Sequence, residues 1–547
     1  MVAECPDVNE RLHDVATYTK ILVACLHVVA LSACTQETSQ RRSHESTHYA
    51  LNEVVPHWDA LGNVRITGDG GLHAVVRPNA HSMYTKTSLR GPEPDEGSGG
   101  KMKMETQITS LVELLSPPHS LNSTPSFPFI SNLIQSSPID FYSSNHQQQL
   151  TLNPDRGPWA VLPTEWQSFF TQAFHQDSDP TSLIRALASC DSHPSFPPSL
   201  ADFLYAVRSL SLPRQPHPQQ RPLFSHPRSP EKSQYESASA SDEDDCVRML
   251  KPRTGIGPKK DREIGQILRL IRSLRLTTSH ALDLGAGRGH LSQALGLEGF
   301  EVLSIDANSQ FELTTAAASF QTTRLDADGI AELLASQPPS LVVGLHACGD
   351  LSPAILSGFL RDAQTHHHTL VLVGCCYNLL TLANIPRSLS FLSSHHLQLA
   401  AQTPASWSAN WGAFERSIVK LAYRSRWASE LAPLEPPRHG RLADRHYESY
   451  TQYRVAAIAK SGVEPKRVLK RSEEDEAMDL WKLSVAWTIR AVLGPCVESL
   501  IVLERFVSTC TVIEETGGQR RVELVNVFDQ CEGQSPRNLA IVIRSLL

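Results

Sequence analysis

The sequence predicts an α/β protein with a doubly wound, mostly parallel sheet and a helical region before it. Residues 279–292 run in the order strand, tight glycine turn and helix. Two later segments, Leu341–Leu345 and Thr369–Gly374, are almost continuously apolar, as strands are when both faces of a parallel sheet are covered. A helical segment between these two strands supplies the crossover that parallel strands need.

The glycine turn has the pattern Asp283-x-Gly285-x-Gly287-x-Gly289. Glycine suits a sharp turn that a ligand approaches closely, because it has no Cβ atom. The dinucleotide fingerprint places its third glycine three residues after the second, where this chain has His290. The spacing therefore disfavours a dinucleotide oxidoreductase and resembles motif I of the class I S-adenosylmethionine-dependent methyltransferases. An ordinary strand-to-helix turn is the alternative.

The next strand, Phe300–Asp306, ends in a carboxylate. In a doubly wound sheet this position lies beside the glycine turn, where Asp306 can accept both ribose hydroxyls of a nucleoside. After a predicted helix, Gln310–Ser319, comes Asp326, where related methyltransferases hold the adenine amino group; an ordinary loop aspartate is the alternative. We expect an S-adenosylmethionine site that is formed by Asp283, Gly285, Gly287, Gly289, Asp306 and Asp326.

Polar clusters, His346–Leu351 and Cys375–Asn378, follow the two apolar strands. Open parallel sheets bind ligands at the carboxyl ends of their strands. We therefore expect His346 and Asp350 to transfer a proton or orient the acceptor, and Tyr377 to stack on a planar acceptor or hydrogen-bond to it. The alternative for His346 is that it only holds the cofactor through its backbone.

Several of these segments together resemble the methyltransferase-like protein 25 family, which includes proteins named for a ribosomal RNA adenine dimethylase domain. The resemblance implies a Rossmann-like fold with seven strands and S-adenosylmethionine as cofactor, and it extends from about Trp159 to the end of the chain. Arg262 stands where the family's lysine-lysine motif is expected to carry a histidine. The segments are Gly257–Lys260, Asp283–Gly289, Gly344–Leu351, Cys375–Tyr377 and Ser535–Val542.

The resemblance leaves the methyl acceptor open. The Asp/Asn-Pro-Pro-Tyr motif, usual in amino-methylating enzymes, is missing from the sequence. The His-x-Cys-Gly and Cys-Cys pair is similar to a family of tRNA ribose methyltransferases, so RNA is a plausible acceptor by analogy. Lys259 and Lys260 are candidates for contact with substrate or phosphate, or are surface lysines. The alternative function is a non-catalytic adapter that binds S-adenosylmethionine or partner proteins.

The eleven cysteines are scattered and form no Cys-x-x-Cys pair, so neither a disulfide framework nor a zinc knuckle is indicated. His346, Cys348, Cys375 and Cys376 have the residue types of a metal site without a recognisable spacing, and we expect no metal. A covalent nucleophile at Cys375 or Cys376 is a minor alternative. Reduced thiols favour a cytoplasmic or nuclear protein, and a net charge of −7 argues against a generally basic nucleic-acid-binding surface.

The segment Ile21–Cys34 is apolar but follows acidic residues and is too short to span a bilayer, so we expect no signal sequence and no membrane. Because helical patterning starts after Met102 and Met104, one of these is hypothesised to be the natural translation start. Five parts are expected in order: a poorly patterned, disordered extension (1–104), a helical region (105–211), a disordered linker or insertion (212–246), the methyltransferase core (247–425), and a C-terminal region (426–547) with helices and closing strands.

Helical periodicity covers most of the remaining chain. In the helical region, proline precedes or opens aromatic-rich helices, whose aromatic residues are expected in a core. Near the C-terminus, Met478–Phe506 is a long apolar-faced helical segment with a break at Gly494–Pro495. Tyr447, Tyr450 and Tyr453 belong to a surface helix, with base stacking as the alternative. Three closing strands are expected at Cys510–Ile513, Glu523–Phe528 and Leu539–Ile543.

Overall fold

The computed structural model describes residues 99–116, 127–136, 157–177, 179–216, 222–226, 257–311, 318–361, 367–431, 442–465, 470–517, 519–530 and 535–545, with four short strands in the first 152 residues. The chain divides into two units, Met1–Asp95 and Glu96–Leu547. Within the first unit the described part is an antiparallel pair, β1 (His57–Trp58) and β2 (Val64–Arg65). The apolar segment Ile21–Cys34 lies outside the described residues.

The predicted helical region is confirmed. Proline stands at helix starts because its fixed φ suits the first turn and its missing N–H costs no hydrogen bond there; Pro163 is the N-cap of α4 and Pro198 opens α6. The elements are α2 (Gly99–Leu115), α3 (Ile130–Gln135), the strand pair β3 (Tyr142–Ser144) and β4 (Leu150–Leu152), α4 (Thr164–Gln176), α5 (Thr181–Ser189) and α6 (Pro198–Leu210).

Aromatic side chains form the core of this region, as predicted. The ring centroid of Trp166 lies 5.0 Å from that of Phe129 and 5.4 Å from that of Phe203. All three rings pack edge-on or tilted, the arrangement that the charge distribution of aromatic rings favours. The Trp166 and Phe203 side chains are fully buried, so they stabilise the core and do not face a substrate.

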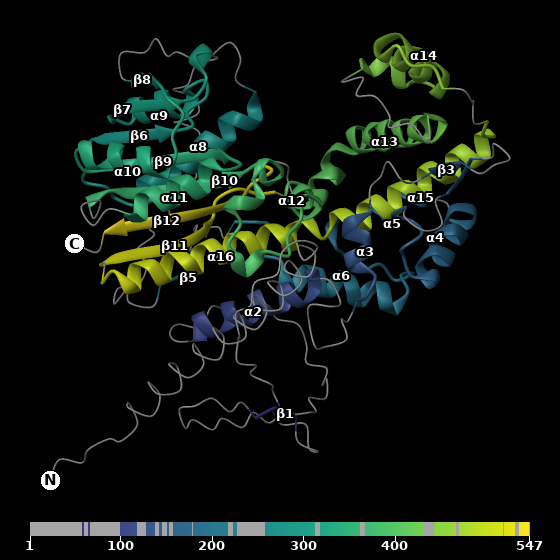
Figure 1. The fold of residues 1–547 in the computed structure, drawn as a ribbon, viewed down its shortest axis with the longest axis horizontal. Helices are drawn as coiled ribbons and strands as arrows, with labels where there is room; N and C mark the ends of the chain where they lie inside the picture. Colours follow the sequence, from purple (N-terminus) through teal and green to yellow (C-terminus); the bar gives the residue numbers. More distant parts are fainter. Residues whose placement is uncertain are drawn as a thin grey trace, which may run out of the picture. The chain divides into compact units, whose positions relative to one another are not determined.

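An eight-stranded sheet with the order β5-β11-β12-β10-β9-β6-β7-β8 is the centre of the second unit (Figure 1). Strands β10, β9, β6, β7 and β8 are parallel, and β12 is antiparallel to both β10 and β11. The strands are β5 (Pro222–Ser225), β6 (His280–Leu284), β7 (Glu301–Asp306), β8 (Ala318–Thr322), β9 (Ser340–Cys348), β10 (Thr369–Cys375), β11 (Arg520–Asn526) and β12 (Leu539–Ser545).

Helices cover both faces of the sheet, which makes the fold doubly wound. Alternate residues of a strand point to opposite faces, so Val343 packs in the core cluster with α8 and α9 while Val342 packs in the cluster with α10, α11 and α16. The predicted Rossmann-like α/β class is therefore confirmed. The helices are α8 (Pro258–Ser273), α9 (His290–Leu297), α10 (Ala327–Ser336), α11 (Leu351–Arg361) and α16 (Gly494–Glu515).

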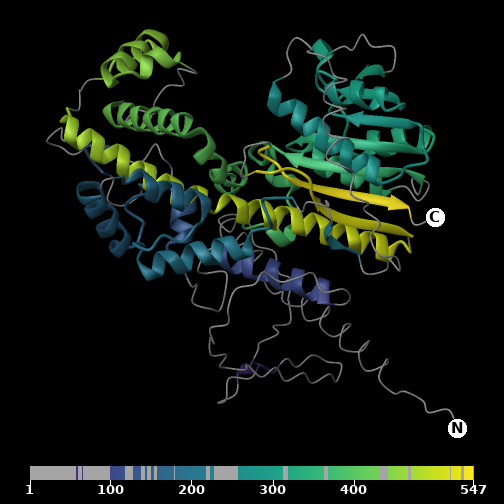
Figure 2. The same ribbon diagram turned by 180° about the vertical axis from the view of Figure 1, so that it is seen from behind.

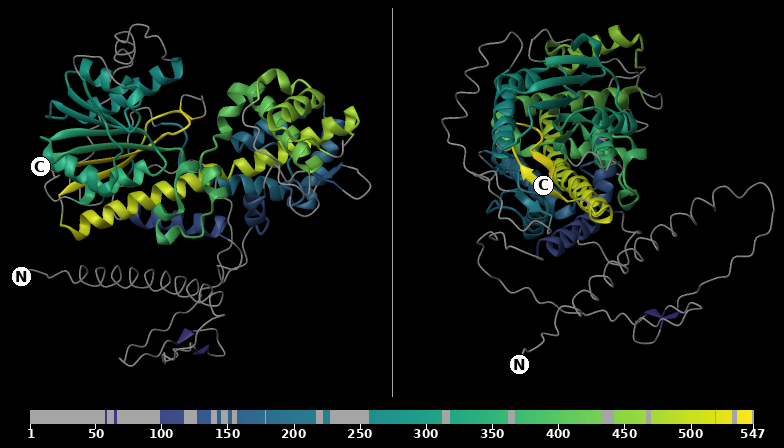
Figure 3. Two further views of the ribbon diagram at one scale, coloured as in Figure 1. Left: turned by 45° about the horizontal axis from the view of Figure 1, so that its top comes forward. Right: turned by 90° about the vertical axis from the view of Figure 1, so that its left-hand side faces the viewer.

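Two long helices connect the sheet with the helical region. Helix α15 (Glu473–Ala491) packs on α4 and α5, and α16 runs along the sheet beside β11 (Figure 3). The predicted break at Gly494–Pro495 separates them. By length and composition Glu473–Glu515 is apolar enough to cross a membrane, but 89% of its most apolar window is buried inside the fold, as in a core helix of a soluble protein.

The remaining helices follow the methyltransferase core. Helix α13 lies between α14 and α15 (Figure 1, Figure 2). They are α12 (Ser394–Ala400), α13 (Trp411–Leu431) and α14 (Tyr450–Ser461), with short 3-10 turns at Ser309–Phe311, Tyr377–Leu379, Leu382–Asn384, Arg387–Leu389, Pro404–Asn410 and Asp444–Tyr447.

Several sequence expectations are wrong. The segment Cys510–Ile513 lies near the end of helix α16 and is not a strand, because Ile513 continues the buried apolar face of that helix. The expected helix Gln310–Ser319 is not formed at its end, since β8 begins at Ala318. Strand β5 lies inside the stretch predicted as a linker and becomes an eighth, edge strand.

The interpretation of the tyrosine segment also changes. Tyr450 and Tyr453 are buried, and the Tyr453 ring centroid lies 5.8 Å from that of Tyr423 on α13. Helix α14 therefore uses these tyrosines to pack against α13, and the two rings are not available to stack on bases.

Candidate active site

The glycine turn between β6 and α9 adopts a backbone that only glycine takes without strain. Gly285, Gly287 and Gly289 have φ angles of +79°, +55° and +67°, in the left-handed region that disfavours a Cβ atom. Gly289 is the N-cap of α9. No protein atom lies within 4 Å of the place where a Cβ of Gly287 would stand, so the space beside this residue is open.

Asp306, at the end of β7, is tied to the glycine turn as the sequence predicts. Its Oδ2 accepts a hydrogen bond from the Gly287 N–H at 2.9 Å, and its Oδ1 accepts one from the Asn308 N–H at 2.9 Å. An ionised carboxylate oxygen has two lone pairs, so each oxygen keeps one for a further donor. The carboxylate is therefore oriented before any ligand arrives.

Asp283 has a different environment. Its side chain is 2% exposed, and its Oδ2 accepts a hydrogen bond from the Ser292 hydroxyl at 2.6 Å. Burial raises the pKa of Asp283 to about 6, because the ionised form loses its hydration. Asp283 therefore links the end of β6 to the first turn of α9, the two elements that the glycine turn connects.

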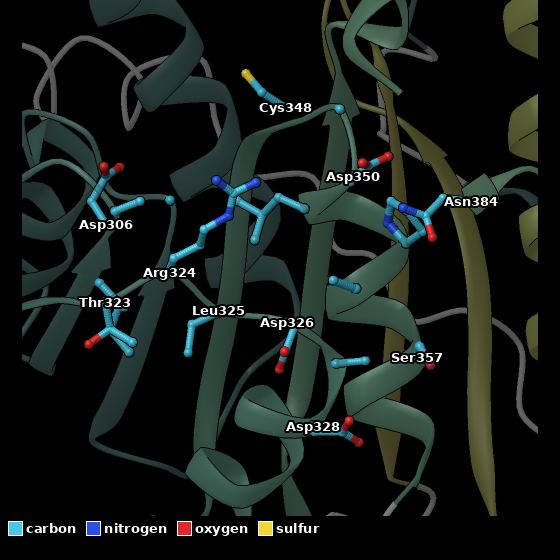
Figure 4. A pocket seen from close by; sticks show the side chains of 18 of the residues that line it. Asp306, Thr323, Arg324, Leu325, Asp326, Asp328, Cys348, Asp350, Ser357 and Asn384 are labelled. Carbon is cyan, nitrogen blue, oxygen red and sulfur yellow. The ribbon is translucent and has the colours of Figure 1, made fainter. Parts of the chain in front are cut away.

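A pocket of about 790 Å³ opens at the carboxyl ends of the strands (Figure 4). A volume of this size is typical of small-molecule sites. Four predicted residues line it: Gly285, Asp306, Asp326 and Asp350. Five predicted residues are not among its lining residues: Asp283, Gly287, Gly289, His346 and Tyr377.

Asp326 and Asp350 hold local structure as well as lining the pocket. Asp326 is the N-cap of α10, where its Oδ1 accepts the Gly329 N–H at 2.9 Å. Asp350 accepts the Thr381 N–H at 2.8 Å. Although partial burial opposes it, this bond and the hydroxyl of Thr381 lower the pKa of Asp350. A carboxylate with a lowered pKa is a weak base, so Asp350 is better suited to orientation than to proton transfer.

His346 occupies a β-bulge. Leu345 pairs with Val373 and Ala347 pairs with Gly374, so His346 is an extra residue in β9. Its φ of +63° is in the left-handed region, which is uncommon for residues other than glycine. Bulges in parallel pairs are rare, and bulges redirect side chains next to active sites.

The bulge brings the His346 ring to Glu263 on α8. The ring Nε2 lies 2.9 Å from Glu263 Oε2, and the Glu263 side chain is only 3% exposed. Although burial opposes it, the hydrogen bond and charge of His346 lower the pKa of Glu263. Lys260, whose Nζ lies 3.6 Å from Glu263 Oε2, contributes to the same effect. The result is an ionised carboxylate that holds the imidazole in place.

Tyr377 is 3% exposed, and two guanidinium groups lie near its ring. The Arg505 and Arg537 groups stand 5.9 Å and 5.5 Å from its ring centroid, and burial raises the pKa of its hydroxyl. Since arginines approach this ring and it is not part of the pocket lining, its predicted contact with a planar acceptor stays a prediction.

Glu263 was not singled out by the sequence analysis, and Cys348 was named there only for its residue type, as a possible metal ligand that we did not expect to bind a metal. Glu263 was passed over because it is one acidic residue on an amphipathic helix, although its position three residues after Lys260 is a usable signal. Cys348 is exposed and lines the pocket. Hydrogen bonding with Cys375 lowers the pKa of Cys348 to about 6, so this thiol, rather than Cys375 or Cys376, is the more acidic one.

Comparison with known proteins agrees with this geometry. Residues 259–383 match the family model described as a methyltransferase domain, and this range contains the glycine turn, Asp306, the bulge and the three cysteines. No solved structure matches the chain.

Two curated relatives carry the name "Probable methyltransferase-like protein 25". The protein of Mus musculus is 27% identical over 241 residues, which is 37% of this chain and 37% of the relative. The protein of Homo sapiens is 25% identical over 233 residues, 37% of this chain and 36% of the relative. The matched part is thus little more than a third of each relative's length. Together these matches confirm that the chain carries a methyltransferase domain and that it resembles the methyltransferase-like protein 25 family.

Proposed function

We propose that the protein is an S-adenosylmethionine-dependent methyltransferase with RNA as its acceptor. The observation that carries the proposal is the hydrogen bond between the Gly287 N–H and Asp306 Oδ2. It fixes a carboxylate at the pocket with one free lone pair on each oxygen, as the two vicinal hydroxyls of a ribose require. An open left-handed turn beside it gives a ligand access to the backbone.

The residues present fit the cofactor. Asp306 would hold the ribose and Asp326, which lines the same pocket, would meet the adenine amino group. Gly285, which lines the pocket, would lie against the ligand without a side chain, and Gly287 would leave the space beside it open. When bound, the cofactor supplies an already activated methyl group, so the protein must align the acceptor and remove its proton.

We propose that His346, which does not line the pocket itself but lies two residues before the pocket residue Cys348, removes that proton. The Glu263 carboxylate only accepts hydrogen bonds when it is ionised, so in the neutral imidazole Nε2 carries the proton and Nδ1 keeps a free lone pair. His346 then takes the acceptor proton at Nδ1, and Glu263 acts as a positioning residue that stabilises the resulting imidazolium. An acceptor such as a ribose hydroxyl carries a proton that has to leave, which agrees with the analogy to tRNA ribose methyltransferases.

Calorimetry with the full 547-residue chain tests the cofactor site. S-adenosylmethionine and S-adenosylhomocysteine are expected to bind one per chain. Asp306→Ala is expected to abolish binding, because the ribose loses its acceptor. Asp191→Ala is the control, since it removes an equally negative but exposed side chain from the helical region.

Transfer of a labelled methyl group to cellular RNA tests the reaction. Transfer by the wild-type chain and none by Asp306→Ala supports the proposal. Cofactor binding without transfer to RNA or protein acceptors would favour the non-catalytic adapter. The absence of binding by a chain with an intact circular dichroism spectrum contradicts the proposal as a whole.

A further inference from the structure

Three cysteine thiols meet at the carboxyl ends of β9 and β10. The Cys348 sulfur lies 3.1 Å from that of Cys375 and 3.4 Å from that of Cys376, and the last two are 3.6 Å apart. Within the described part of the chain they form a group of ligand atoms that all lie within 4.8 Å of one another. Sequence spacing did not reveal this group, because its members come from two different strands.

Strand pairing and one strained residue bring the thiols together. Cys348 and Cys375 are direct partners in the parallel register of β9 and β10, so their side chains lie on the same face. Consecutive residues of an extended strand point to opposite faces, but Cys376 has a φ of +49°. This left-handed conformation turns its side chain back toward Cys375. Such strain in a residue other than glycine persists where the surrounding structure demands it.

We propose that Cys348, Cys375 and Cys376 form a binding site for one thiophilic d¹⁰ cation, Zn²⁺. Zinc–thiolate bonds of about 2.3 Å in tetrahedral geometry hold the sulfurs about 3.8 Å apart. The present separations of 3.1 to 3.6 Å therefore need to widen by less than about 1 Å to reach this spacing. Three thiolates select a soft or borderline cation over Mg²⁺ or Ca²⁺.

The surroundings suit such a site. Three thiolates and Zn²⁺ carry one net negative charge, and the buried guanidinium of Arg537 interacts electrostatically with Cys375 and Cys376. Cys348 is exposed and lines the pocket of Asp306. With three protein ligands, the fourth position stays open to water or to a substrate group, as in catalytic zinc sites. This inference goes beyond methyl transfer and does not depend on cofactor binding.

Metal titration of the full chain tests the site. The chain is freed of metal and kept reduced, and Co²⁺ is added while thiolate-to-cobalt charge-transfer absorption is recorded; Zn²⁺ is then added as competitor. One equivalent of Co²⁺ is expected to bind and to be displaced by Zn²⁺. Cys348→Ser and Cys376→Ser are each expected to weaken Zn²⁺ binding at least about 100-fold, because one of three ligands is lost.

Cys190→Ser is the control, since it removes a thiol that lies at the end of α5 and leaves the three proposed ligands. It is expected to bind Zn²⁺ like the wild type. Circular dichroism separates loss of a ligand from loss of the fold. The proposal is overturned if the reduced, folded wild type shows no charge-transfer band. It is equally overturned if both ligand variants bind Zn²⁺ as tightly as the wild type does.

Discussion

The two halves of the site differ in how they are built. On the proposed cofactor side, Asp306 at the end of β7 accepts a hydrogen bond from Gly287 in the glycine turn, and Asp283 before the turn accepts one from Ser292 after it. On the acceptor side, Glu263, His346 and the three cysteines come from a helix and two strands that are far apart in the sequence. The first half is formed by residues that are close together in the sequence. The second half forms only because the start of α8 and the ends of β9 and β10 meet at one edge of the sheet.

This difference assigns different tasks to the halves. The cofactor side offers backbone N–H groups and an oriented carboxylate, which bind a ligand without reacting with it. On the proposed acceptor side stand an imidazole and thiols, which are groups that can exchange protons or bind metals, and both His346 and Cys376 have left-handed backbones. Strain that is maintained by the fold is typical of functional positions. Substitutions should therefore separate binding from turnover along this division.

The largest expected effect comes from the acceptor side. His346→Asn is expected to lower methyl transfer about 100-fold or more, because the base at Nδ1 is lost, while S-adenosylhomocysteine affinity stays unchanged. Glu263→Gln keeps an acceptor for Nε2 but removes the charge, and its loss is expected to be smaller. Transfer rates beside calorimetric affinities check this. If His346→Asn also lost affinity for S-adenosylhomocysteine, then cofactor binding and methyl transfer would not be separate tasks of the two halves.

The next effect is on the pH dependence of folding stability, which is expected to change in opposite directions at Asp283 and Asp350. The folded-state pKa of Asp283, about 6, lies above the ordinary value of 3.8. Asp283 therefore stabilises the fold below about pH 4, and this contribution is lost as pH rises through 6. At 1.36 kcal/mol per pKa unit the loss amounts to about 3 kcal/mol. The stability of Asp283→Asn relative to the wild type should rise by this amount between pH 4 and 7.

Asp350 is the matched comparison, because its pKa is lowered. Its contribution is present above the ordinary pKa and lost as pH falls through the folded one, so Asp350→Asn should lose relative stability as pH rises. Urea unfolding of the three chains at several pH values measures both trends. Curves for Asp283→Asn and the wild type that stay parallel over this pH range would contradict the assignment of a raised pKa.

The smallest expected effect is that of adding a Cβ atom in the glycine turn, and it tests whether the cofactor approaches Gly287. Gly287→Ala and Gly462→Ala place a Cβ at φ angles of +55° and +72°, with no protein atom within 4 Å in either case. Both should lose about 1 kcal/mol of unfolding free energy. Only Gly287→Ala should also lose cofactor affinity, by roughly tenfold. Equal affinity of all three chains would show that the ligand does not approach Gly287.

Elements whose signals are local could be predicted from the amino-acid sequence. The glycine turn, the apolar strands β9 and β10, the proline-started helices and the break at Gly494–Pro495 all follow from residues close together in the chain. Periodicity and turn chemistry act over a few residues, so a single sequence reveals them. The carboxylate of Asp306 belongs here too, because its strand follows the turn directly.

The remaining features depend on how distant segments pack against one another. A β-branched segment such as Cys510–Ile513 suits a strand or a buried helix equally, and its packing within α16 settled the choice. The short strand β5 forms because β11 offers it an edge. The pairing of Glu263 with His346 and the meeting of Cys348 with Cys375 depend on the crossover of parallel strands, which brings distant strand ends together at one edge. No local pattern encodes those contacts, because they arise from the register of the sheet.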